Sequence, residues 1–384
     1  MAEAPHVTID RATFAADPYP ALAAMRAQTP ICYVPELGAT LLTRRADIHR
    51  EEKRVHVLSS HQPQGLMTRL MGENLMRKDG AAHQAERRIL FPALSPRSVQ
   101  DRWLPLFRDA AGRLLDELAP RGRADLVTDY AMPLAGAALV AITGLARMTP
   151  ARMDAVSQAM IDGCANYAGD ETVEARCHAA TAEIDAEIDA ALADAPEMSV
   201  LRVQRDAGLP MASIRANVKL VISGGQNEPR DAIAGTIAAL LMHPEALGHI
   251  RARRCDWGAA FDEYARWQAP IGMSPRQIAA PDTIGGLRFE TGDRVFLMFG
   301  SAGRDEAVFD NPDRFDILRD TGPAIPFGAG PHFCAGAAAA RALIVTVALP
   351  LAFARLPGLR LTGDVRWHGW AFRGPAAVPA AWDA

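Results

Sequence analysis

The sequence predicts a protein that is mainly α with a small β region, and three observations support this prediction. Residues from about 97 to 215 follow helical patterns that prolines interrupt. A second and longer helical pattern extends from Ala216 to Leu241, with Pro229 as its only proline. Two short apolar runs, Ile31–Val34 and Thr40–Thr43, flank a turn and predict a hairpin.

Composition limits the class of protein. The chain has 384 residues, of which 49% are apolar and 22% charged, as in globular proteins large enough to bury a core and a cofactor. The net charge of −4 gives no electrostatic reason to expect a nucleic acid partner. Repeats and low-complexity linkers are absent from the sequence, so we expect a single domain over residues 1–384. The five cysteines are scattered and odd in number, which favours a reducing compartment over a disulfide framework.

The first part of the chain predicts short elements in a fixed order. Residues 14–29 predict an entry loop and a helix, the hairpin follows, and Arg45 begins another helix. Residues 58–80 are irregular and rich in methionine, which indicates either a loop with a few core anchors or an adaptable cover over an apolar pocket. A helix begins at His83, and Arg87 lies one turn later on the same face.

The stretch Phe327-Gly328-Ala329-Gly330-Pro331-His332-Phe333-Cys334-Ala335-Gly336 is the most informative part of the sequence. Glycine and proline disfavour regular structure before Cys334, and the alanine-rich run after Gly336 favours a helix. A thiolate at such a loop-to-helix junction is stabilised by main-chain N–H groups and is a suitable axial ligand for haem iron. The alternatives are a buried inert thiol and a zinc ligand, although no cysteine or histidine pair at zinc spacing lies nearby.

This stretch resembles the haem-binding loop of the cytochrome P450 family. Two further signatures support the resemblance: Glu263 and Arg266 match a glutamate-x-x-arginine motif, and Pro312-Asp313-Arg314-Phe315 matches a second motif. The resemblance implies a haem-thiolate monooxygenase fold, with haem b (iron protoporphyrin IX) between the long helix and the Cys334 loop. It also implies that Arg314 completes a buried charge cluster with the first motif.

The resemblance assigns cofactor contacts residue by residue. Four cationic side chains are implied to hold the haem propionates, and each could instead be an ordinary surface charge: His83, Arg87, Arg276 and His332. Cys334 is the implied iron ligand, and Phe327, Gly328 and Gly336 shape its loop. Gly224 and Gly225 match the small pair that lies beside the iron in the long helix.

The long helix departs from the family at the residues that handle oxygen. The usual acid and alcohol, which relay protons while O2 is cleaved, are here Asn227 and Glu228. Asn227 does not titrate but can orient a water, and Glu228 can donate a proton if burial raises its pKa. Pro229 is expected to kink the helix and to push Glu228 out of the α region. Alternatively, Glu228 pairs with Arg230 away from the iron.

Several apolar and small side chains are implied to line the substrate pocket. These candidates are Met67, Met71, Leu220, Ser223, Ile271 and Phe372. For Phe372 the alternative is plain core packing. The side-chain types favour a small or medium hydrophobic molecule.

The resemblance implies a monooxygenase that inserts one oxygen atom of O2 by hydroxylation or O-dealkylation. The resemblance implies a separate ferredoxin and ferredoxin reductase as electron donors, and we expect a cytoplasmic monomer without a membrane segment. The altered relay keeps two alternatives open. One is a peroxide-using or non-oxidative haem-thiolate enzyme, and the other is a non-catalytic haem sensor or carrier.

Overall fold

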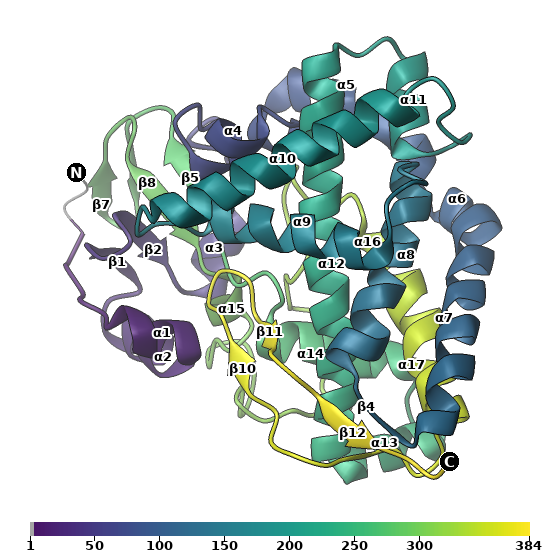
Figure 1. Cartoon of the computed structure of the whole chain (residues 1–384). Helices are drawn as coiled ribbons and strands as arrows, with labels where there is room; N and C mark the ends of the chain where they lie inside the picture. Colours follow the sequence, from purple (N-terminus) through teal and green to yellow (C-terminus); the bar gives the residue numbers. More distant parts are fainter. Residues whose placement is uncertain (1–3) are drawn as a thin grey trace. The chain divides into compact units, whose positions relative to one another are not determined.

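The computed structural model describes residues 4–384, so residues 1–3 of the expected single domain lie outside it. The described chain forms two compact units, each considered by itself. Unit 1 comprises the residues up to Gln62, Gly248–Cys334 and Arg366–Gly374, and unit 2 comprises Pro63–Leu247, Ala335–Val365 and Pro375–Ala384. A single domain over residues 1–384 stays a prediction. The mainly α architecture with a small β region is confirmed (Figure 1).

Unit 1 is built on a five-stranded sheet in the order β1-β2-β8-β5-β3. The predicted hairpin is confirmed, because β1 pairs antiparallel with β2 and Ile31 lies opposite Leu42. All four residues of β2 are buried, as in a strand covered on both faces. The strands of this sheet are β1 (Ile31–Val34), β2 (Ala39–Leu42), β3 (Leu58–Ser59), β5 (Ser274–Ile278) and β8 (Arg294–Leu297).

Short helices and a second hairpin complete unit 1. These elements are α1 (Arg11–Ala16), α2 (Tyr19–Gln28), α3 (Arg45–Glu51), β6 (Asp282–Ile284), β7 (Leu287–Phe289), α14 (Trp257–Gln268), α15 (Phe299–Ala302) and β10 (Trp367–His368). From Gly303 to Gly336 the chain has no helix or strand. This irregular stretch includes Cys334, so its backbone polar groups need partners from elsewhere.

Unit 2 is helical, as the patterns predict. Its principal helices are α4 (Leu66–Met71), α5 (Gly80–Leu94), α6 (Pro96–Ser98), α7 (Leu104–Leu118), α8 (Met132–Thr143), α9 (Pro150–Cys164), α10 (Glu171–Ala191), α11 (Val200–Asp206), α12 (Met211–Met242), α16 (Ala337–Arg341) and α17 (Leu349–Arg355). A small sheet joins β4 (Arg123–Asp125), β12 (Pro379–Ala381) and β9 (Arg360–Leu361). At the borders of the units lie α13 (Pro244–Arg251) and β11 (Gly374–Pro375).

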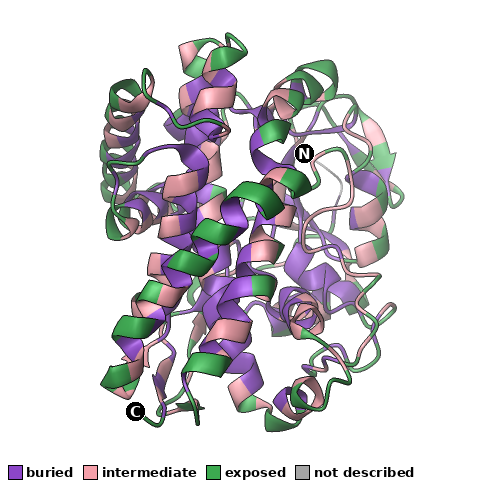
Figure 2. Cartoon of the chain, turned by 90° about the vertical axis from the view of Figure 1, so that its right-hand side faces the viewer, coloured by how far each residue is buried: buried purple, intermediate pink, exposed green. Residues whose placement is uncertain are grey.

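Helix α12 is the core of unit 2, and α8, α9 and α10 pack against it (Figure 1). Helix α12 is buried on more than one side. Outer helices such as α7 have one buried face and one face exposed to solvent (Figure 2). The prediction that Pro229 drives Glu228 out of the α region is wrong, because the helix is unbroken from Met211 to Met242. Tertiary packing on several sides holds the residue before proline in a conformation that it avoids in isolation.

The methionine-rich segment is more ordered than its sequence predicts. It contains α4 and a 3-10 turn over Leu75–Arg77, and both contain buried apolar residues. The buried amide of Asn217 accepts a hydrogen bond from the Leu75 N–H at 2.7 Å, which fixes this turn to α12. From Pro63 onward the segment is therefore an anchored part of unit 2, with buried core anchors as one alternative predicted, and a role as a cover over a pocket stays a prediction.

Close packing of α8 on α9 generates a stability prediction. A Cβ atom added at Gly136 would lie 2.7 Å from the Pro150 Cα, whereas one added at Gly112 of α7 meets nothing within 4 Å. We expect Gly136→Ala to lower the free energy of unfolding by about 1–3 kcal/mol through overpacking. Gly112→Ala is the matched control and should raise it by up to about 1 kcal/mol through helix propensity. Denaturant titration measures both, and equal effects would contradict the packing argument.

Candidate functional site

The Cys334 loop is closed by hydrogen bonds between its own ends. The Cys334 N–H donates to the Phe327 carbonyl at 2.9 Å, and the Phe333 N–H donates to the Gly330 carbonyl at 3.0 Å. Gly328 has φ of +78°, a conformation that favours glycine. Among the five cysteines only Cys334 is exposed. The hydrogen bonds and the glycine of the motif therefore hold the loop backbone in a conformation that leaves the Cys334 thiol exposed.

The helix after the loop begins later than Cys334. Gly336 is the N-cap of α16, which continues through a π-helical stretch (Ala342–Ala348) into α17. Of the helices in residues 4–384, only this one, Ala337–Arg355, is long and apolar enough to cross a membrane. This is weak evidence for a membrane span, because core helices of soluble proteins satisfy the same criterion.

Two of the predicted propionate partners lie in unit 1. Arg276 of β5 is 3% exposed, and its Nη1 donates to the Ser274 Oγ at 2.5 Å and to the Pro275 carbonyl at 2.9 Å. Its Nη2 lies 3.8 Å from Oε1 of Glu52, a carboxylate that is only 1% exposed. His332 is half-buried in the loop, two residues before Cys334. Glu52 is a residue that the sequence analysis did not single out.

The other two predicted partners lie on α5 in unit 2. His83 is 2% exposed, and Arg87 is half-buried one turn later, whereas Arg88 is exposed. This difference in burial separates Arg87 from its solvated neighbour. The propionate roles of all four residues stay predictions.

A buried ion pair organises the irregular stretch before the loop. Arg266 binds both carboxylate oxygens of Glu263 at 2.7 Å, and neither side chain is exposed. Its Nη1 also donates to the carbonyls of Gly303 at 2.7 Å and Pro312 at 2.8 Å. One guanidinium thus serves a carboxylate and two backbone acceptors that have no helix or strand partner.

The third member of this charge cluster is Arg319 rather than Arg314. The Arg314 side chain is exposed, and only its carbonyl, at 3.1 Å from Arg266 Nη2, takes part. Arg319 Nε lies 3.4 Å from Oε1 of Glu263, and its side chain is 10% exposed. The expectation for Arg314 is therefore wrong, because the irregular backbone directs that side chain outward. Arg319 belongs to neither of the two sequence motifs, and no pattern in the sequence indicates that it takes part in the cluster.

Glu228 lies in the interior of α12 in unit 2. Both of its carboxylate oxygens are buried, and neither has a hydrogen-bond partner in the described chain. Burial raises the pKa of Glu228 to about 8; its own backbone N–H lowers the pKa in part, and the charges of Asp231 and Arg230 act in opposite directions. Arg230 itself binds Asp154 at 3.1 Å and Asp231 at 2.9 Å. The guanidinium is thus committed to other acids, which disfavours the alternative that it pairs with Glu228.

Asn227 has a different environment from its neighbour. Its Oδ1 accepts a hydrogen bond from Ser157 Oγ at 2.5 Å, and its Nδ2 donates to Gln158 Oε1 at 2.7 Å. Both partners are on α9, and Asn227 is 3% exposed. We therefore correct the expected role of Asn227: the side chain fixes α12 to α9, and its polar atoms are already engaged where a water would have to bind.

The two glycines of α12 face different surroundings. Gly224 is exposed, and a Cβ atom there would meet nothing within 4 Å. A Cβ atom at Gly225 would lie 2.7 Å from Leu139 Cδ2 of α8. Gly224 thus leaves open space beside the helix, as a cofactor-facing position requires, whereas the structure explains Gly225 by helix packing.

The predicted pocket residues divide between the units. In unit 2, Ser223 is buried and donates to the Leu220 carbonyl at 3.1 Å, while Met67 and Met71 lie on α4. The Met71 sulfur lies 3.5 Å from Cys164 Sγ, so this side chain packs against α9. In unit 1, Ile271 and Phe372 form an isolated antiparallel bridge, and the adjacent Gly272 N–H donates to the Ala371 carbonyl at 2.9 Å.

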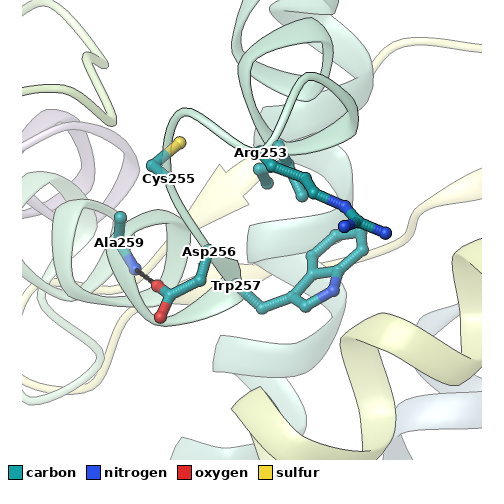
Figure 3. Close-up of a pocket in the computed structure, with 6 residues that line it drawn as sticks. Arg253, Cys255, Asp256, Trp257 and Ala259 are labelled. Carbon is teal, nitrogen blue, oxygen red and sulfur yellow. Dashed lines mark hydrogen bonds between the residues drawn. The ribbon is translucent and has the colours of Figure 1, made fainter.

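A concavity with a volume of about 630 Å³ lies in unit 1 beside the start of α14. Six residues line it: Ile250, Arg253, Cys255, Asp256, Trp257 and Ala259. The Asp256 carboxylate accepts a hydrogen bond from the Ala259 N–H at 3.0 Å and caps the helix (Figure 3). Burial raises the pKa of Cys255, so this thiol is not activated. The concavity includes none of the predicted site residues.

The sequence analysis missed the polar residues that support the predicted ones. Glu52 follows Ile48 by four positions and shares its buried face, so a charge there is unusual in itself. The α9 partners of Asn227, Ser157 and Gln158, occupy successive positions of an ordinary helical pattern. Only the packing of α9 on α12 reveals them.

Comparisons with known proteins agree on one family. The family model described as Cytochrome P450 matches residues 258–349. A putative cytochrome P450, YjiB of Bacillus subtilis (strain 168), is 28% identical over 90% of this chain and 89% of its own length. Luteothin monooxygenase of Streptomyces thioluteus is 27% identical over 84% of this chain and 81% of its own.

A solved structure has the same fold. The crystal structure of the myxobacterial cytochrome P450 CYP267B1 in complex with myristic acid superposes with a TM-score of 0.85. The two sequences are 26% identical, and the match covers 97% of this chain and 98% of the other.

The charge cluster generates a prediction that separates Arg319 from Arg314. Replacing Arg319 with Gln removes a cation from a fully buried carboxylate and should lower the free energy of unfolding by about 1–3 kcal/mol. Arg314→Gln is the matched control and should change it by less than about 0.5 kcal/mol, because only the Arg314 backbone is used. Denaturant titration of both variants measures the difference. A larger loss for Arg314→Gln would reverse the assignment.

Proposed function

This chain is a bacterial-type cytochrome P450 of the monooxygenase class, and we propose that Glu228 supplies the protons for its reaction. The proposed reaction inserts one oxygen atom of O2 into a small or medium apolar substrate, by hydroxylation or O-dealkylation. The observation that carries the proposal is a buried carboxyl group without a hydrogen-bond partner, in the interior of the longest helix. Its position in the chain is that of the alcohol in the family's usual relay.

The side chains present fit a haem cofactor, which we propose to be haem b. Cys334 offers the exposed thiol of a closed loop, and Gly224 leaves open space beside α12. Arg276 and His332 in one unit, and His83 and Arg87 in the other, are the proposed propionate partners. When bound, a thiolate-ligated haem supplies electron density that favours cleavage of the O–O bond.

Glu228 suits a proton donor at neutral pH. With a pKa of about 8 the carboxyl group is mostly protonated at pH 7, in contrast to an exposed glutamate. A group with a pKa near the working pH can both give a proton and recover it. Because both polar atoms of the Asn227 side chain are hydrogen-bonded to α9, Glu228 delivers the proton without help from Asn227.

The types of the proposed pocket side chains and the names of relatives support a proposal for the substrate. The proposed pocket residues are mainly apolar, with Met67, Leu220, Ile271 and Phe372 as the largest members. Relatives named for their reactions include a steroid C26-monooxygenase and a 20-oxo-5-O-mycaminosyltylactone 23-monooxygenase. We propose a hydrophobic small molecule, electrons from a ferredoxin and its reductase, and a monomer in the cytoplasm.

The test of the proposed function is the coupling of electron consumption to product in a Glu228→Gln variant. Ligands that convert the ferric protein from low to high spin first identify a substrate. With that substrate, the variant should consume reductant at a comparable rate but yield at least about tenfold less product per electron pair, because an amide donates protons poorly. Product and reduced nicotinamide are measured together in a reconstituted ferredoxin system.

The control is Asp189→Asn, which removes an acid of α10 in the same unit. Asp189 pairs with Arg215 and is not among the charges that act on Glu228, so its loss should leave coupling within about twofold of the wild type. Unchanged coupling in Glu228→Gln would overturn the proton role. Peroxide-supported turnover that equals the reductase-supported rate in both variants would instead favour a peroxide-using enzyme.

The raised pKa of Glu228 also predicts a pH dependence of stability. The unfolded carboxyl titrates near 4.5 and the folded one near 8, so between these values the folded state holds one more proton than the unfolded state. The free energy of unfolding should therefore fall as pH rises from about 4.5 to about 8. Glu228→Gln should lack this component and lose less stability between pH 5 and 8. Denaturant titrations at both pH values decide, and parallel pH profiles would contradict the pKa assignment.

A further inference from the structure

Glu52 is a buried acid that ends α3 in unit 1 and contacts the Cys334 loop. We propose that Glu52 is a positioning residue that holds this loop in place and, through Arg276, sets the reduction potential of the bound cofactor. The proposal rests on the proposed haem site, because only a bound haem gives it a functional consequence. It concerns side chains of this chain alone, and all of its contacts lie within unit 1.

The first contact joins Glu52 to the backbone of the loop. Its Oε2 accepts a hydrogen bond from the Ala329 N–H at 2.8 Å. A Cβ atom at Gly328 would lie 2.8 Å from Oε1 of Glu52, and one at Gly330 would lie 2.7 Å from its carbonyl oxygen. Both glycines therefore permit the close approach of the loop to Glu52. A charge-assisted hydrogen bond in this buried setting holds the loop firmly.

The second contact joins Glu52 to a proposed propionate partner. Its Oε1 lies 3.8 Å from Nη2 of Arg276, and the two side chains are 1% and 3% exposed. Nη1 of Arg276 is held separately by Ser274 and Pro275. Part of the positive charge of Arg276 is thus compensated inside the protein, by an acid whose other oxygen holds the loop.

These two contacts give Glu52 an electrostatic effect on the cofactor. A buried negative charge disfavours the addition of an electron nearby, because the low-dielectric interior screens it weakly. The loop that Glu52 holds contains the hydrogen bond from the Cys334 N–H to the Phe327 carbonyl. Hydrogen bonding and charge around a thiolate ligand are known determinants of the potential of thiolate-ligated iron.

The test is a potentiometric titration of the haem-loaded Glu52→Gln variant. Glutamine keeps an oxygen that can accept the Ala329 N–H but removes the charge. The ferrous form should be favoured about tenfold, which corresponds to a shift of about +59 mV for a one-electron couple. Glu51→Gln is the matched control, because Glu51 is equally buried, one residue away, and bound to Arg50 and Arg54. In this control variant, the ratio of ferrous to ferric protein at a given applied potential should stay within about twofold of the wild-type ratio.

Two further readouts keep the proposal separate from the proposed function. A wild-type protein without the red-shifted ferrous–CO band of thiolate ligation would refute the haem site itself. With that band present, equal potentials in wild type and Glu52→Gln would overturn the electrostatic role of Glu52. Hydrogen exchange of the wild-type protein tests the loop contact without any variant: the Ala329 amide should be protected, and exchange as fast as in an open loop would overturn the positioning role.

Discussion

The ion pair between Glu263 and Arg266 is the interaction on which the Cys334 segment depends. From Gly303 to Gly336 the chain is irregular, so its carbonyl groups lack the partners that helices and strands provide. Arg266 accommodates this by binding the carbonyls of Gly303 and Pro312 as well as both oxygens of Glu263. Removing Glu263 would leave the Arg266 charge buried with backbone carbonyls only, and removing Arg266 would leave the Glu263 carboxylate with Arg319 at 3.4 Å as its remaining cation. A buried charge that has lost its main counter-charge is strongly destabilising.

Buried polar side chains on α12 differ in whether they have hydrogen-bond partners. Asn227 and Arg230 have partners on α9 or on α12 itself, and these bonds fix the two helices in one register. Glu228 has no hydrogen-bond partner and retains its proton to a higher pH. A buried group left in this state is destabilising for the fold, and the proposed role of Glu228 in proton delivery would account for its presence. The hydrogen-bonded neighbours keep the Glu228 carboxyl group in a defined place.

The sequence predicted elements and motifs better than it predicted the supporting contacts. The hairpin, the helix order and the Cys334 loop follow from local patterns, because turn residues and apolar periodicity act over short distances. Arg319 and Glu52 could not be found this way, since each becomes informative only when a distant segment packs against it. The sequence left proton donation by Glu228 conditional on a pKa raised by burial, which depends on packing, and its helical conformation before Pro229 was likewise decided by tertiary packing.

The bridge between Ile271 and Phe372 constrains how this protein can be re-engineered. The residues that flank these two positions are joined by backbone hydrogen bonds, from the Gly272 N–H to the Ala371 carbonyl and from the Arg373 N–H to the Pro270 carbonyl, and a Cβ atom at Gly272 would clash with the Trp370 carbonyl oxygen. Side chains at the two positions therefore respond to each other, and residues in contact show non-additive effects. Libraries that vary them one at a time would miss compatible pairs. Combinatorial libraries at both positions, with Gly272 kept, suit this geometry, and epistasis between them is expected throughout.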